Sequence, residues 1–196
     1  MGSRLRVIAG EARGLHLIAA PGVRPTSGRV REAVFSSLGD VGGMSVLDLF
    51  AGTGALAIEA LSRGADLAVL VERDRASAEA CRQNLTTTHL ADRARVVTRA
   101  VAAVLAGPIP GEAPFDLVCC DPPYDLDPTE LYAVLGGLAQ PGWAHPGSRI
   151  VLERPARAAA ASPHDSPDGW PDAWRGGWER KYGDTLVTVL RPSQAA

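Results

Sequence analysis

From residue 45 onward, short apolar runs alternate with longer segments of helical periodicity. The apolar runs predict strands at 45–50, 67–71, 94–98, 115–120 and 149–153. The segments between them predict helices at 54–63, 75–85, 100–106 and 128–138. Nearly continuous apolar strands joined by helices are typical of a parallel sheet that helices cover on both faces, so we expect an α/β fold.

Weaker patterns precede this alternation. Residues 4–20 alternate around a glycine-containing turn, which predicts a hairpin. A helix is predicted at 28–38 and ends at Gly39. We therefore expect residues 1–40 to form an N-terminal extension of a main domain at 41–196.

The C-terminal part of the main domain departs from the strand–helix rhythm. Residues 155–174 are rich in proline and predict a flexible loop. The runs 178–182 and 185–190 predict a final hairpin that turns at Gly183-Asp184.

The net charge of −2 over 196 residues hides an uneven distribution. Residues 1–40 carry six arginines against three acidic residues, a net charge of +3, whereas residues 101–150 carry one arginine against six acidic residues, a net charge of −5. A basic extension on an acidic body indicates a site for a polyanion such as RNA, the alternative being a solvated surface. The arginines concerned are Arg4, Arg6, Arg13, Arg24, Arg29 and Arg31.

Composition excludes several other classes of protein. With 46% hydrophobic and 21% charged residues the chain is not wholly disordered. No apolar run approaches the ~18–20 residues of a membrane span, and no secretory signal is visible. The three cysteines are Cys81, Cys119 and Cys120, a pattern that predicts no disulfide framework and no metal site. We expect a cytoplasmic protein without a membrane partner, in which Cys119 and Cys120 belong to the core.

The first candidate motif runs from Asp48 to Gly54, between a predicted strand and a predicted helix. Glycines at 52 and 54 let the backbone approach a ligand closely, and the following helix N-terminus favours an anionic group. Asp48, Gly52 and Gly54 are therefore candidates for cofactor binding. Read alone, the same residues are also compatible with a tight turn.

A second candidate, Glu72, ends the next strand 18 residues after Gly54. A carboxylate at this position can accept hydrogen bonds from both hydroxyls of a ribose. The alternative is a surface acid that pairs with Arg73 or Arg75.

The third motif, Asp121-Pro122-Pro123-Tyr124, directly follows the fourth strand. Two consecutive prolines hold the chain extended, which lets the Asp121 carboxylate and the Pro122 carbonyl face one spot. Both groups accept hydrogen bonds and so suit an amino group with two donors. Tyr124 adds a flat face on which a base can stack. These four residues are the candidate catalytic residues.

Together, the three motifs resemble those of class I S-adenosylmethionine-dependent methyltransferases, in the branch whose D/N-P-P-Y/F motif marks methylation of amino nitrogens. The stretches 6–10, 13–14 and 24–35 further resemble the RsmD family. This resemblance implies a Rossmann-like, mostly parallel seven-stranded sheet with helices on both faces, and S-adenosylmethionine as cofactor.

The resemblance to the RsmD family also implies an activity. It is methylation of the exocyclic N2 of a guanine in 16S ribosomal RNA, by resemblance guanine-966. The RNA substrate is either naked or part of an assembling small ribosomal subunit, and we expect the protein to be a monomer. The resemblance adds Arg73 to the cofactor-binding residues and Thr26, beside Arg24, to the RNA-binding residues.

The sequence departs from the family pattern at three places, one of which is the 155–174 loop, which is longer than is typical of the family. Arg99-Ala100 follows the third strand where an acidic or amide residue usually reads the adenine, so we expect backbone contacts near Ala100 and Val101 instead. Ser27-Gly28 stands where Thr-Asp is more usual, at the start of the predicted helix.

Other functions share parts of this pattern. Adenine-N6 DNA methyltransferases and protein-glutamine methyltransferases also use a D/N-P-P-Y motif, but the chain has no large target-recognition domain, and its basic extension does not suit a peptide. A non-catalytic nucleic-acid-binding module is the remaining alternative, against which the intact Gly52, Gly54, Glu72 and Asp121 argue.

Overall fold

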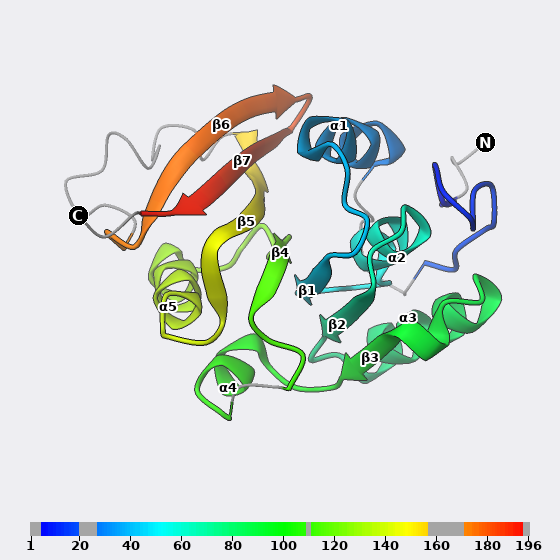
Figure 1. Ribbon diagram of the computed structural model, residues 1–196, viewed down its shortest axis with the longest axis horizontal. Coiled ribbons are helices and arrows are strands. Elements are labelled where there is room, and N and C mark those ends of the chain that lie inside the picture. The colour runs from blue at the N-terminus through cyan, green and yellow to red at the C-terminus, as the bar shows by residue number, and fades with distance from the viewer. Residues whose placement is uncertain (1–4, 20–26, 109–110, 157–170, 194–196) are drawn as a thin grey trace.

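Seven strands form one sheet in the order β3-β2-β1-β4-β5-β7-β6 (Figure 1). The computed structural model describes residues 5–19, 27–108, 111–156 and 171–193. The strands are β1 Ser45–Leu49, β2 Leu67–Val71, β3 Ala94–Val97, β4 Phe115–Cys120, β5 Ala144–Pro155, β6 Trp174–Tyr182 and β7 Thr185–Pro192. The helices are α1 Gly28–Leu38, α2 Ala55–Ser62, α3 Arg75–Thr87, the short 3-10 helix η1 Ala91–Arg93, α4 Val101–Leu105 and α5 Pro128–Leu138.

The pairing of the strands explains the shape of the sheet. β3, β2, β1, β4 and β5 are parallel neighbours, whereas β7 is antiparallel to both β5 and β6. The chain runs outward from β1 to β2 and β3 on one side, and from β4 to β5 on the other. The boundary between β1 and β4 is therefore a topological switch point, where ligands of open α/β sheets bind beyond the carboxyl ends of the strands.

Helices cover both faces of the sheet, as the sequence predicts. On one face, side chains of α1, α2 and α3 pack against residues such as Val46, Leu70 and Cys119. On the other face, α4 and α5 pack against residues such as Leu47, Val71 and Cys120. Neighbouring strand residues point to opposite faces, so Cys119 and Cys120 both lie in the core, and both are fully buried.

Most predicted boundaries agree with the structure to within two residues, and the larger differences lie near the C-terminus. α1 begins at Gly28, where the Ser27 hydroxyl caps it by accepting a hydrogen bond from the Val30 amide. β5 begins at Ala144 rather than residue 149, and β6 begins at Trp174 rather than residue 178. Tertiary pairing extends these strands through glycine and proline, which weaken a sequence signal for a strand. Of the predicted 155–174 loop, residues 157–170 lie outside the described residues.

The N-terminal extension packs against α2 rather than extending away from it. Residues 5–17 form the predicted hairpin. Its two arms are joined by hydrogen bonds from the Val7 amide to the Leu15 carbonyl (3.0 Å) and from the Leu17 amide to the Leu5 carbonyl (2.9 Å). The Glu59 carboxylate accepts hydrogen bonds from the backbone of this hairpin, from the Ile8 amide at 2.9 Å and the Ala9 amide at 3.1 Å. The side chains of Val7, Ala12 and Leu17 are buried in the α1–α3 core.

We predict that Gly10 is the tightest point of this contact. Its φ is +82°, and a Cβ there would lie 1.7 Å from the Ser62 carbonyl oxygen. Gly14 has a similar φ of +85° with nothing within 4 Å of an added Cβ, and so provides a matched control. Gly14→Ala should cost about 1–2 kcal/mol for its left-handed backbone alone. Gly10→Ala should cost about 1–3 kcal/mol more, because the hairpin must move off α2.

Thermal unfolding of the two variants beside the wild type measures this difference. Equal losses of stability in both variants would show that the hairpin does not depend on its close approach to α2.

Candidate active site

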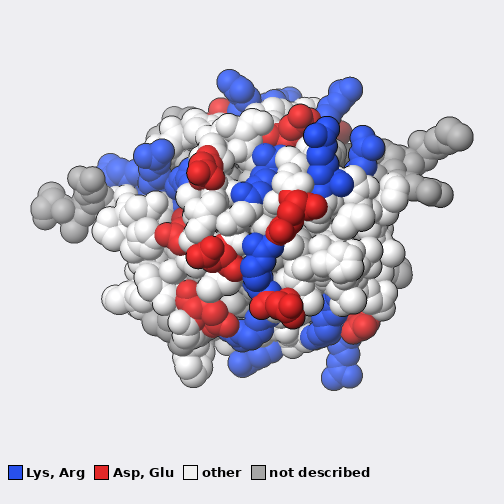
Figure 2. Space-filling view, turned by 45° about the vertical axis from the view of Figure 1, so that its right-hand side comes forward, with Lys and Arg blue, Asp and Glu red and all other residues white. Residues whose placement is uncertain are grey.

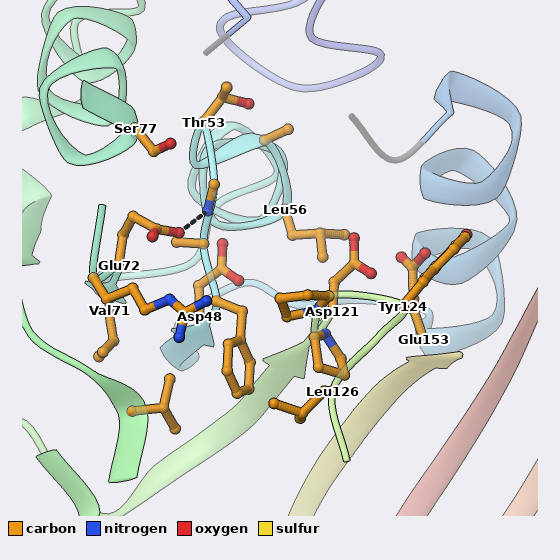
Figure 3. A pocket seen from close by; sticks show the side chains of 18 of the residues that line it. Asp48, Thr53, Leu56, Val71, Glu72, Ser77, Asp121, Tyr124, Leu126 and Glu153 are labelled. Atoms are coloured by element: carbon orange, nitrogen blue, oxygen red, sulfur yellow. Dashed lines mark hydrogen bonds between the residues drawn. The ribbon is translucent and has the colours of Figure 1, made fainter. Parts of the chain in front are cut away.

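One large pocket opens at the switch point, beyond the carboxyl ends of β1, β2 and β4 (Figure 3). Its volume is about 1300 Å³, and its lining runs from the start of α1 to the turn between β6 and β7. A pocket of this size exceeds the common range for one small ligand, about 300–1,000 Å³. The pocket therefore has room for two ligands side by side.

The loop after β1 turns through two glycines of left-handed backbone conformation. Gly52 and Gly54 have φ of 55° and 78°, and Gly54 begins α2. A Cβ on Gly54 would lie 2.8 Å from a methyl group of Leu70, so the close packing of loop on sheet needs glycine there. Phe50 also has a positive φ, 59°, and its placement beside the pocket is a feature that sequence reasoning missed.

Asp48 lies at the bottom of the pocket and is 1% exposed. Its carboxylate accepts one hydrogen bond from the Ala57 amide, at 3.1 Å. Burial raises the pKa of Asp48 from 3.8 to about 7, and the negative charges of Asp121 and Glu72 add to the effect, against the Ala57 hydrogen bond, which lowers it. Asp48 thus titrates near neutral pH in the folded protein.

Glu72 is held in place by two backbone amides. One carboxylate oxygen accepts a hydrogen bond from the Gly52 amide at 2.9 Å, which Figure 3 marks, and the other accepts one from the Asp74 amide at 2.8 Å. The carboxylate therefore joins the glycine loop to the end of β2. Each of its oxygens has a second lone pair that remains available to a ligand hydroxyl.

The remaining candidates for cofactor binding lie around the same side of the pocket. Arg73 lines it next to Glu72, and Ala100 and Val101 line it at the start of α4. The pocket lining does not include Arg99.

The Asp121–Tyr124 segment crosses the pocket on the β4 side, and all four residues line it. Tyr124 is 40% exposed, and its hydroxyl lies 3.2 Å from the Thr185 hydroxyl at the start of β7. This contact joins the segment to the β6–β7 hairpin and leaves ring surface open to solvent. Cys119 and Cys120, directly before it, are fully buried, and burial raises the pKa of both thiols, so neither provides a nucleophile.

Sequence reasoning missed one acidic residue of the pocket, Glu153. It lies near the end of β5, is 3% exposed and lines the pocket together with Asp121. The sequence did carry a signal for this residue. Glu153 ends the predicted apolar strand 149–153, and Glu72 and Asp121 likewise stand at the ends of apolar strands. Among the described residues, no group of three or more metal-ligating side chains could hold a metal ion.

The candidate RNA-binding residues divide into three groups. Arg6, Arg13 and Arg29 are exposed. Arg4, Arg24 and Thr26 lie outside the described residues. Arg31 is 1% exposed and donates a hydrogen bond to the Arg6 carbonyl at 2.6 Å, so the phosphate contact expected of it is wrong for this structure: its guanidinium faces the interior.

On the face drawn in Figure 2, the basic side chains of the described residues do not form one continuous patch. Figure 2 shows arginine and lysine side chains interspersed with acidic ones on the face that it draws. None of the helices in the part of the chain described is long and apolar enough to cross a membrane.

The order of the strands and the pocket at the switch point are those of the class I methyltransferase fold. Ribosomal protein L11 methylase of Lactobacillus delbrueckii has this fold, with a TM-score of 0.68 and 14% identity over 90% of this chain and 93% of that chain. A hypothetical protein of Thermus thermophilus is more similar, with a TM-score of 0.75 and 31% identity over 95% and 99% of the two chains.

The family can be stated more closely. The model of the family described as Conserved hypothetical protein 95 matches residues 5–191, and the chain belongs to this family of RsmD-type methyltransferases. The Ribosomal RNA small subunit methyltransferase D of Escherichia coli K12 is 43% identical over 124 residues. That alignment covers 62% of this chain and 61% of the relative, so the chain spans about three fifths of its length.

The Asp48 carboxyl predicts how stability depends on pH. Its pKa is higher in the folded than in the unfolded protein, so its contribution to stability is complete below pH 3.8 and is lost as the pH rises through about 7. A difference of this size corresponds to on the order of 4 kcal/mol. Asp48→Asn, which cannot ionise, should therefore be more stable than the wild type at pH 8, with little difference at pH 4.

The measurement is the melting temperature between pH 4 and pH 8. Asp66→Asn, which removes an exposed carboxyl group, is the control and should follow the wild type throughout. A constant offset between Asp48→Asn and the wild type at every pH would contradict the raised pKa.

Proposed function

We propose that this chain transfers the methyl group of S-adenosylmethionine to the exocyclic N2 of a guanine, guanine-966, in 16S ribosomal RNA. The observation that carries the proposal is that the Asp121–Tyr124 segment and the glycine loop with Glu72 line the same pocket. The Asp121–Tyr124 segment suits an amino group, and the glycine loop with Glu72 suits a nucleoside. RsmD-type relatives whose names specify the small-subunit ribosomal RNA support the choice of substrate.

The residues of the pocket fit S-adenosylmethionine. Glu72, fixed by two backbone amides, suits the ribose hydroxyls, and the starts of α2 and α4 suit close backbone contacts with the rest of the nucleoside. The acidic groups at the bottom of the pocket suit a positively charged ligand. When bound, this cofactor supplies an electrophilic methyl group on a sulfonium.

The task of the protein is then to orient a weak nucleophile. The lone pair of the guanine amine is delocalised into the ring. Hydrogen bonds from the two amine protons to the Asp121 carboxylate and the Pro122 carbonyl localise that pair and aim it. Tyr124 holds the plane of the base by stacking. Positioning of this kind contributes up to roughly 7–11 kcal/mol in well-oriented reactions.

The exposed arginines of the N-terminal extension are the proposed RNA contacts. Arg6 and Arg13 lie on the hairpin and Arg29 lies at the start of α1, whose neighbour Ser27 lines the pocket. An RNA held along these residues has its flipped base within reach of Tyr124. The proposal assigns residues 1–40 to RNA binding and residues 41–196 to the cofactor and to catalysis.

Glu72→Ala should weaken the binding of S-adenosylmethionine. The change leaves ribose hydroxyls without a partner and releases the Gly52 amide, at a cost on the order of 1–3 kcal/mol, which is about 5- to 150-fold in Kd. Isothermal titration calorimetry measures it, with Glu79→Ala on the exposed face of α3 as the control. If Glu72→Ala bound the cofactor as tightly as the wild type, the ribose assignment would be wrong.

Asp121→Ala should abolish methyl transfer and leave the affinity for S-adenosylmethionine nearly unchanged, because the carboxylate faces the amine. Asp121→Asn should retain part of the activity, because its amide oxygen still accepts a hydrogen bond. Asp125→Ala, an exposed residue four positions later, is the control and should stay active.

Methylation of 16S ribosomal RNA and mass mapping of the modified nucleotide provide the measurement. They also test the function itself. The appearance of N6-methyladenine in DNA, or no product with the wild type, would overturn it.

A further inference from the structure

The mechanism above leaves one buried acid of the pocket without a role. Glu153 lies on β5, and its Oε1 atom is buried without a hydrogen-bond partner among the described residues. A buried polar atom with no partner is costly, on the order of 1–3 kcal/mol. A residue of this kind beside the proposed reaction centre indicates a function rather than a contribution to stability.

The sheet register places Glu153 beside Asp121. Cys120 of β4 pairs with Leu152 of β5, so the next residue of each strand is Asp121 and Glu153. Cys120 and Leu152 pack on the α4–α5 face, and their successors therefore point to the opposite face, toward α1 and α2. Figure 3 shows both carboxyl groups on the same side of the pocket.

The charges around Glu153 favour its protonated form in the free protein. Burial raises the pKa of Glu153 well above its ordinary value, and the negative charges of Asp121 and Asp48 raise it further. The positive charge of Arg31 on α1 acts in the opposite direction. Other titratable groups also surround this part of the pocket. Asp48, Asp121, Tyr182 and Asp184 line it, and Arg31 approaches Glu153 from α1 with Glu59 as its second acidic neighbour.

We propose that Glu153 holds the proton that the target amine loses, and that it receives this proton through Asp121. The inference rests on the proposed function. Methyl transfer forms a carbon–nitrogen bond, breaks a carbon–sulfur bond whose electron pair stays on sulfur, and leaves the nitrogen positively charged. The nitrogen–hydrogen bond that faces Asp121 then breaks, its electron pair stays on nitrogen, and the proton passes to the Asp121 carboxylate.

From Asp121 the proton moves to the Glu153 carboxylate and later leaves to solvent. Glu153 is the better place for it, because it is 3% exposed whereas Asp121 is only partly buried, and a less solvated carboxylate binds a proton more tightly. A cationic ligand in the pocket favours the ionised form of Glu153 at the start of the cycle. Glu153 thus acts through Asp121, as a positioning residue. Once the proton has moved on to Glu153, Asp121 is ionised again and can hold the next base.

The decisive variants are Glu153→Gln, which keeps the shape but cannot take up a proton, and Glu153→Asp, which keeps the carboxyl group. Glu79→Gln, at an exposed carboxyl group of α3 that does not line the pocket, is the control. Glu153→Gln should lower kcat about 100-fold, which is the lower end of the rate contribution of proton transfer by a side chain. The Kd for S-adenosylmethionine and for RNA should not change. Glu153→Asp should restore part of kcat, and Glu79→Gln should match the wild type.

Two pH profiles separate a proton-holding role from a structural one. The kcat of the wild type should rise with pH on the acid side, and Glu153→Gln should lack this rise. In the free protein, Glu153→Gln should gain melting temperature over the wild type as the pH rises from 5 to 8, which is a readout independent of turnover.

Wild-type kcat and an unchanged acid limb in Glu153→Gln would overturn the inference, as would a loss of cofactor affinity, which would make Glu153 a ligand instead. An inactive wild type would overturn the proposed function rather than the role of Glu153. The melting profiles would then still decide whether Glu153 holds a proton, because a constant difference between variant and wild type at every pH contradicts it.

Discussion

Four carboxyl groups stand near the carboxyl ends of four neighbouring parallel strands, and their mutual repulsion constrains the rest of the pocket. In the order of the sheet they are Glu72 after β2, Asp48 on β1, Asp121 after β4 and Glu153 on β5. Like charges this close cannot all ionise in a buried site without compensation. The structure provides that compensation differently for each carboxyl group, and the differences correspond to the proposed roles.

Backbone amides compensate the two acids on the cofactor side. Glu72 accepts two such hydrogen bonds, and Asp48 accepts one from the start of α2. The glycine loop is therefore held by the same groups that we expect to hold the ribose. On the other side, Glu153 Oε1 has no hydrogen-bond partner among the described residues, and the positive charge of Arg31 opposes the rise of its pKa. A cation or a proton compensates this site, and in the proposed reaction the methylated amine supplies the proton.

Arg31 connects this chemistry to the N-terminal extension. The charge of Glu153 acts on its guanidinium from the pocket, and on the hairpin side the guanidinium donates a hydrogen bond to the Arg6 carbonyl. The hairpin in turn is held on α2 by Glu59 and by the close approach of Gly10 to Ser62. A segment that charge alone marked as an RNA-binding arm is thus also part of the support of the proposed reaction centre, and its removal is not a neutral change.

The sequence by itself determined the order and type of nearly every element, because apolar runs with period 2 or 3.6 record directly which faces are buried. It also determined the glycine loop, Glu72 and the Asp121–Tyr124 segment, whose chemistry is contained in contiguous residues or in a spacing along one βαβ unit. Only the tertiary structure decided that Arg31 is buried and that Glu153 stands beside Asp121. Both depend on contacts between segments far apart in the chain: Arg31 reaches a hairpin 25 residues earlier, and Glu153 is brought to Asp121 by the pairing of β5 with β4. Sequence periodicity places a residue on a face of its own element, but strand register and helix packing determine which distant side chain shares that face.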